Sequence, residues 1–100
     1  MDTLGIIVKS IARYDWIVNL TAAATAKRKA VRIHFADRGV LLLRDFDIRQ
    51  LAKLARVTIC EQSARDQGLD ESLCAGLGKL MVPFDESAKL ICECERNVIF

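Results

Sequence analysis

Segments typical of β-strands alternate with segments typical of helices, and this alternation constrains the fold more than any other feature. Short apolar runs with β-branched residues predict strands over residues 4–9, 31–36, 56–60 and 97–100. Helix-favouring segments lie over residues 15–29, 48–55, 61–67 and from Pro83 onward. Strands joined by helices pair in parallel, because crossovers of this length favour βαβ units. The chain is therefore predicted to form an α/β three-layer sandwich around a mostly parallel sheet of four to five strands.

Three other segments have less regular patterns. Residues 40–43 suit either a helical turn or a strand, and residues 69–78 are predicted to form a loop. Residues 79–82 would supply the fifth strand if they pair with the sheet. The final helix is expected to pack through an apolar face made of Phe84, Ala88, Ile91 and Cys92.

The length and composition suit a single domain over residues 1–100. A chain of 100 residues, 52% of them apolar, can bury about two thirds of its surface on folding. The net charge is +2 and the basic residues are dispersed, so we expect no direct binding of nucleic acid. No apolar run approaches the roughly 18 residues of a membrane span, and residues 1–4 hold no basic segment. We therefore expect a cytoplasmic protein without a membrane partner.

The four cysteines are expected to be reduced thiols. They are Cys60, Cys74, Cys92 and Cys94, and no Cys-x-x-Cys pair occurs, so no metal site is predicted. Cys92 and Cys94 would point about 200° apart on a helix, with Cys92 on its apolar face and Cys94 off that face. The first strand is followed by no glycine, so no nucleotide or flavin cofactor is expected at that turn.

Cys60 is the main candidate for chemistry. It is the last residue of the predicted strand 56–60, and a predicted helix follows directly. Unpaired backbone amides at a helix start favour a thiolate, which is the nucleophilic form of cysteine. Arg65 would add positive charge one turn later, whereas the adjacent Glu61 would oppose it. The alternative is that Cys60 is a small apolar residue that merely packs at the strand end.

Two further residues could support such a site. Cys74, in the predicted loop, could resolve a disulfide or persulfide formed on Cys60. His34 is the only histidine and shares a strand face with Arg32, from which it could approach a site; otherwise it is packed or faces solvent. It has no acid partner at a fixed spacing, so the sequence predicts no catalytic triad.

Several short motifs together suggest a family. They are residues 4–8 (LGIIV), His34-Phe35 running into residues 37–40, residues 57–60 followed by 63–65 and 68–69, residues 76–78, and residues 94–96 before 98–100. In this order they resemble the DsrE/DsrF-like family of small sulfur-handling proteins, which includes a subunit of the sulfur relay for tRNA thiolation. The resemblance spans nearly the whole chain, although this chain is shorter between the second and third strands.

The resemblance implies a specific chemistry. Family members have a parallel α/β fold and associate as trimers or hexamers, and in sulfur-carrying members a cysteine that ends the third strand accepts sulfane sulfur as a persulfide. Cys60 falls at that position, so the resemblance implies a sulfur carrier with donor and acceptor proteins as partners and no metal or organic cofactor.

Two other functions remain open from the sequence. The chain could be a non-catalytic assembly or regulatory subunit whose cysteines only pack, or a redox sensor that pairs Cys60 with Cys74. A homotrimer or homohexamer is also expected, because exposed apolar residues at 40–43 would gain from burial against a copy.

Overall fold

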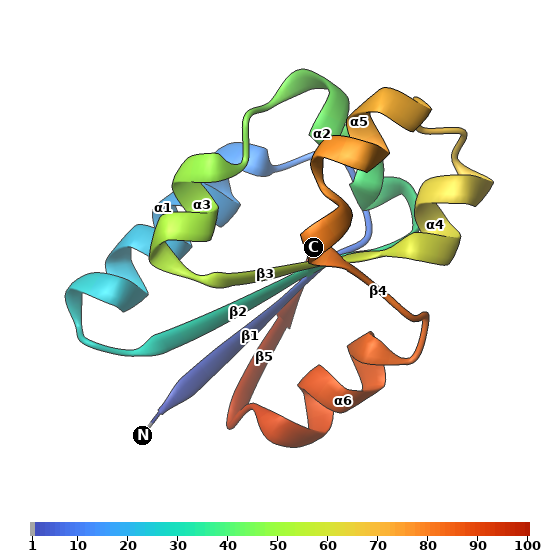
Figure 1. The fold of residues 1–100 in the computed structure, drawn as a ribbon. Helices are drawn as coiled ribbons and strands as arrows, with labels where there is room; N and C mark the ends of the chain where they lie inside the picture. The colour runs from blue at the N-terminus through green and yellow to red at the C-terminus, as the bar shows by residue number, and fades with distance from the viewer. Residues whose placement is uncertain (1) are drawn as a thin grey trace.

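The computed structural model describes residues 2–100 and has a five-stranded sheet at its centre (Figure 1). The strand order is β4-β3-β2-β1-β5, and every neighbouring pair is parallel. The strands are β1 (Thr3–Val8), β2 (Ala30–Phe35), β3 (Arg56–Cys60), β4 (Met81–Val82) and β5 (Arg96–Ile99). The predicted α/β fold with a parallel sheet is confirmed, and the last two residues of the segment 79–82 supply the fifth strand as β4.

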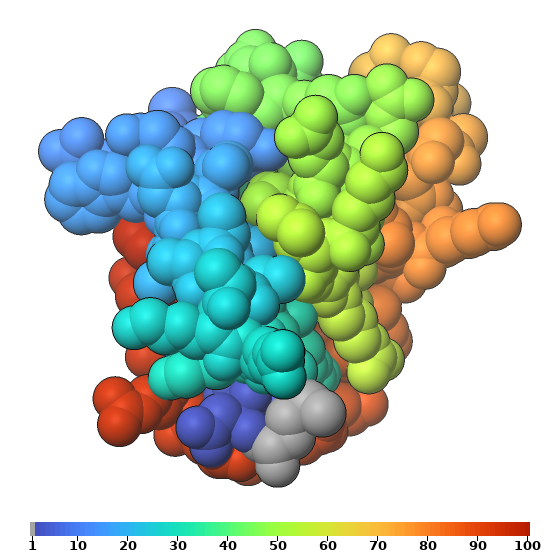
Figure 2. Space-filling model, turned by 90° about the vertical axis from the view of Figure 1, so that its left-hand side faces the viewer, coloured from blue at the N-terminus to red at the C-terminus, as the bar shows by residue number. Residues whose placement is uncertain are grey.

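Helices cover both faces of this sheet. The helical segments are α1 (Tyr14–Ala26), the 3-10 turn η1 (Asp37–Leu41), α2 (Leu42–Asp45), α3 (Arg49–Leu54), α4 (Glu61–Asp66), α5 (Glu71–Gly76), the 3-10 turn η2 (Gly78–Leu80) and α6 (Glu86–Glu93). Figure 2 shows α1 and α3 side by side across one face of the molecule. In Figure 1, α6 lies on the opposite side of the sheet. No helix among the described residues is long and apolar enough to cross a membrane.

The strand order explains why α6 lies apart from the other helices. From β1 to β4 each connection steps in the same direction across the sheet, whereas the connection through α6 returns past β1 to β5. Right-handed crossovers that step in opposite directions place their helices on opposite faces of a parallel sheet. The topology therefore leaves α6 to cover β1 and β2 from the far side.

Side chains alternate between these two faces along each strand. The main core lies on the α1 side and includes Ile33 and Phe35 of β2 and Ile59 of β3, all fully buried. A smaller apolar cluster on the α6 side joins Ile7, Leu90 and Cys94.

Residues 40–43 form a helical turn and lie in the core. Val40, Leu42 and Leu43 are buried against the main core, and Leu41 is half-buried. The expectation that these residues are exposed was wrong, so they offer no surface to a second copy. Buried apolar side chains stabilise the monomer instead, because the turn folds over the end of β1.

Two predicted elements differ from the structure. Residues 69–78 are not a loop, because α5 occupies Glu71–Gly76 and begins where the Asp70 side chain accepts a hydrogen bond from the Ser72 backbone N–H. Helix α1 ends at Ala26 rather than at Lys29, and Arg28 just beyond it has a left-handed φ of 61° that cannot continue a helix.

The predicted apolar face of the last helix is also wrong. Phe84, Ile91 and Cys92 are exposed, and the buried stripe of α6 runs through Glu86, Leu90 and Cys94 at a spacing of four. This stripe includes a carboxylate, which is buried because Arg32 on the sheet neutralises it. A count of apolar residues alone therefore selected the wrong side of the helix.

Candidate functional site

The candidate site starts at the junction between β3 and α4. Cys60 ends β3 and is the N-cap residue of α4. Its thiol therefore lies at a strand-to-helix turn, as the sequence predicts. Its Sγ accepts a hydrogen bond from the backbone N–H of Ser63 over 3.5 Å. A sulfur atom here satisfies one of the amides that a helix start leaves unpaired.

Cys60 is almost covered by the protein. Only 5% of its surface is exposed, and the alternation along β3 places its side chain on the α6 side of the sheet, like Thr58. In register it lies beside Val82 of β4. A reagent reaches this sulfur freely only when the neighbouring segments move.

Ser63 connects the Cys60 junction to the end of β2. Its hydroxyl accepts a hydrogen bond from the backbone N–H of Asp37 over 2.8 Å, while its own N–H donates to Cys60. Asp37 adopts a left-handed φ of 49°, which turns the chain sharply after β2. The ends of β2 and β3 are thus held together at the carboxyl edge of the sheet, where parallel sheets place reactive groups.

Arg65 does not contact the thiol. Its guanidinium forms an ion pair with Glu61 one turn earlier, and both side chains are largely exposed. The positive charge of Arg65, which was expected to help a thiolate at Cys60, is therefore balanced by the carboxylate of Glu61.

Cys74 lies on α5 and is half-buried. It lines a pocket of about 740 Å³, together with Arg65 and Met81. Cys60 is not among the described residues that line this pocket. The structure therefore places Cys74 near α4 without joining its thiol to that of Cys60.

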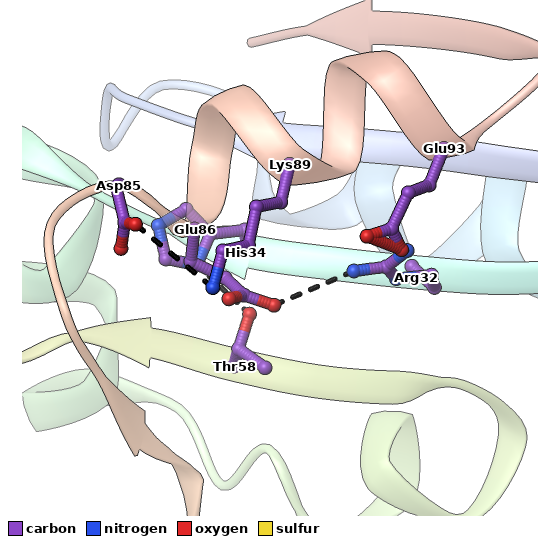
Figure 3. Close-up of polar contacts among 7 residues, drawn as sticks. All are labelled: Arg32, His34, Thr58, Asp85, Glu86, Lys89 and Glu93. Atoms are coloured by element: carbon purple, nitrogen blue, oxygen red, sulfur yellow. Dashed lines mark hydrogen bonds and ion pairs between the residues drawn. The ribbon is translucent and has the colours of Figure 1, made fainter.

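His34 belongs to a polar cluster beneath α6 (Figure 3). The imidazole is fully buried, and its Nδ1 shares a hydrogen bond of 2.8 Å with the Thr58 hydroxyl of β3. Arg32 lies on the same face of β2 and pairs with Glu86 at 3.4 Å and with Glu93 at 2.7 Å. Among residues 2–100, no hydrogen bond reaches the Nε2 atom of His34.

The ionisation of His34 follows from this burial. Removal from water lowers the pKa of His34, Glu86 opposes this shift, and the nearby positive charge of Arg32 adds to it. The imidazole is therefore neutral at pH 7. It is an unusual group for the middle of a parallel sheet, whose faces are normally apolar.

The other two cysteines exchange their expected positions. Cys92 is exposed on α6, whereas Cys94 is buried beside Ile7 and Leu90, and all four thiols are free. Burial raises the pKa of the Cys94 thiol, which makes this residue a poor nucleophile. Within the described part of the chain, no three His, Cys, Asp or Glu side chains are grouped to hold a metal ion.

The geometry of the chain itself marks out the candidate site. No family model matches the chain. No curated protein and no solved structure matches it either. Two features stand out in the described residues, namely the Cys60 junction and the polar cluster of His34, Thr58, Arg32 and Glu86.

Thr58 and Glu86 were not predicted from the sequence as site residues. Polar residues inside predicted strands were the available signal, since His34 and Thr58 each lie between two apolar residues and opposite each other in register. Glu86 gave no comparable signal, because its partner lies 54 residues away in the sequence.

Proposed function

We propose that this chain is a cytoplasmic sulfur carrier in which Cys60 accepts sulfane sulfur as a persulfide and passes it to a partner thiol. The observation that carries the proposal is the hydrogen bond from Ser63 N–H to Cys60 Sγ at the carboxyl end of β3. A backbone amide directed at sulfur stabilises a negative charge on it. The resemblance of the sequence to the DsrE/DsrF-like family supports the same residue.

The transfer needs only thiol exchange. The Cys60 thiolate attacks the outer sulfur of a donor persulfide, the sulfur–sulfur bond of the donor breaks, and the donor leaves as a thiolate. Cys60 then carries the outer sulfur together with its proton. An acceptor thiolate on a second protein attacks that sulfur in turn and regenerates the Cys60 thiolate. Every step exchanges one sulfur–sulfur bond for another, so no external oxidant or reductant is consumed.

The burial of Cys60 favours a second candidate function. A thiol that is 5% exposed fits a non-catalytic assembly or regulatory subunit whose cysteines only pack. The two candidates differ in what the protein does with a donor. A carrier opens the junction and loads Cys60, whereas a packing cysteine stays unreactive until the chain unfolds.

Loading with a donor separates these candidates. With a single equivalent of a small-molecule persulfide at neutral pH, we expect the added sulfur on the Cys60 peptide after trapping by alkylation and mass spectrometry. Cys60→Ser should lose this label. Cys92→Ser, which removes an exposed thiol, should keep it. Label found on Cys92 while Cys60 stays unmodified would support the packing function and refute the carrier.

We also propose that the chain assembles as a homotrimer or homohexamer, as the family resemblance implies. The support is that resemblance alone, since the segment 40–43 is buried. Light scattering at micromolar concentration should give three or six times the mass of one chain. A monomeric mass would contradict this assembly without bearing on the chemistry of Cys60.

A further inference from the structure

Helix α6 is attached to the sheet by a narrow seam. Its buried stripe consists of Glu86, Leu90 and the C-cap residue Cys94, of which Leu90 and Cys94 pack on Ile7 and the backbone at Gly5. A Cβ atom on Gly5 would clash with the side chain of Leu90 and lie 3.1 Å from Cys94 Sγ, so the helix packs directly on β1. The seam thus joins one apolar cluster of Ile7, Leu90 and Cys94 to the ion pairs that Arg32 forms with α6.

Those polar contacts depend on a balance of charge. Arg32 on β2 lies between Glu86 and Glu93 of α6, with Arg32 and Glu86 both mostly shielded from water. A buried ion pair holds two elements together only while both charges stay matched, because an unmatched buried charge is strongly unfavourable. The docking of α6 is thus sensitive to any buried charge near Arg32 that lacks a hydrogen-bond partner of its own.

His34 is the group that can supply such a charge. It is fully buried on the same face of β2, two residues after Arg32. Its Nε2 lacks a hydrogen-bond partner among the described residues. In the doubly protonated imidazole both ring nitrogens carry a proton, and the Nε2–H would have no acceptor among the described residues. Glu86, the carboxylate that favours the cation, is already paired with Arg32.

The charged and titratable groups near His34 come from three elements. Figure 3 shows Arg32 of β2 and, from α6 and its start, Asp85, Glu86, Lys89 and Glu93. Cys94 lies beside Arg32, and β3 carries Arg56 and Cys60 two residues on either side of Thr58. Lys89 pairs with Asp85 at 3.9 Å, and Arg32 pairs with both glutamates. Arg32 thus faces two glutamates with one positive charge, so Glu86 still favours a cation on His34, and removal of the imidazole from water is what opposes one.

We propose that α6 is a proton-sensitive flap, which leaves the sheet when His34 takes up a proton. With the helix docked, the proton would create a buried cation whose Nε2–H lacks an acceptor among residues 2–100. With the helix away, the imidazole is in water, where the cation is readily hydrated. Acid therefore favours the open arrangement, in which α6 and the thiol of Cys94 become accessible.

The direction and range of the pH effect follow from linkage. Burial lowers the pKa of His34 in the docked state, so the open state binds more protons once the pH falls below the ordinary histidine value of about 6.5. Opening then increases by up to about tenfold for each pH unit, until the lowered pKa of the docked state is reached. Above about pH 7.5 both states hold a neutral imidazole and the opening is independent of pH.

Two cysteines of the same helix region provide the measurement. Cys94 is covered by the seam, whereas Cys92 is exposed and serves as an internal reference for the reactivity of the reagent. With dithiodipyridine as the probe, the ratio of Cys94 to Cys92 labelling should rise up to about tenfold between about pH 7.5 and 5.5. Amide exchange of α1 on the other face should show no matching increase, because the opening is local.

The variant His34→Gln is the control, since its amide can still bond to Thr58 but cannot take up a proton. Its labelling ratio should not change with pH. If this variant fails to fold, the wild-type protein still decides, because its single histidine gives one NMR titration. A His34 midpoint at or above the ordinary value, a flat wild-type ratio, or α1 opening together with α6 would each overturn the proposal.

Discussion

Replacing Gly39 with alanine is expected to destabilise the fold by at least about 3 kcal/mol, the upper end of typical overpacking costs. Gly39 is buried in η1, where its N–H donates to the Ala36 carbonyl over 2.9 Å. A Cβ atom there would lie 2.6 Å from the carbonyl carbon of Val8 and closer still to its oxygen. Both obstacles are backbone atoms at the end of β1, so a change of rotamer cannot relieve the clash.

Urea unfolding measures this loss, and Gly76→Ala is the matched control. Gly76 ends α5, and nothing lies within 4 Å of a Cβ built on it. That variant should be as stable as the wild type or gain up to about 1 kcal/mol, because glycine disfavours a helix. If Gly39→Ala unfolds within about 1 kcal/mol of the wild type, then η1 does not press on the end of β1 as described.

The strands were predictable because their signal is local. Residues 56–60 form β3 with the predicted bounds, and Val57 and Ile59 face the main core as their alternation requires. The parallel arrangement also followed from the sequence, since helical segments separate the strands. The place of Cys60 at the end of β3 could be derived from these patterns alone.

Burial of the site residues was less predictable, because it depends on contacts between distant segments. His34 was expected on the face that Arg32 shares, and it is there, but its complete burial comes from the return of α6 across that face. The positions of Cys92 and Cys94 were exchanged for the same reason. The side of α6 that packs is selected partly by the pairing of Glu86 with Arg32, which no local periodicity encodes.

The coverage of Cys60 has a similar origin. Its neighbours in the sequence indicate only a strand end before a helix, whereas its low exposure also reflects β4, which pairs beside it through Val82. Residues 79–82 were expected to form a strand only if they paired with the sheet, so the accessibility of the Cys60 thiol could not be predicted from local patterns. Local patterns thus place the candidate nucleophile but leave its accessibility to tertiary packing.

Truncating Leu90 to alanine is expected to cost about 2 to 5 kcal/mol, the range for buried leucines. Leu90 is 1% exposed and is the large apolar side chain that α6 contributes to its cluster with Ile7 and Cys94. Removing the Leu90 side chain leaves a cavity between α6 and the sheet, and only Ile7 and Cys94 of the cluster remain to fill it. Because α6 packs apart from the main core, the free energy of detaching this helix should fall together with the global stability.

Ile91→Ala is the matched control, since Ile91 is the next residue on the same helix and is 47% exposed. Its effect on urea unfolding should stay within about 0.5 kcal/mol, as for surface substitutions. Labelling of Cys94 at neutral pH should increase strongly in Leu90→Ala and little in Ile91→Ala, because only the first loosens the seam above that thiol. Equal effects of the two variants on Cys94 labelling would mean that α6 packs through the predicted face that includes Ile91. The charge pair at Arg32 would then have no part in choosing the buried face.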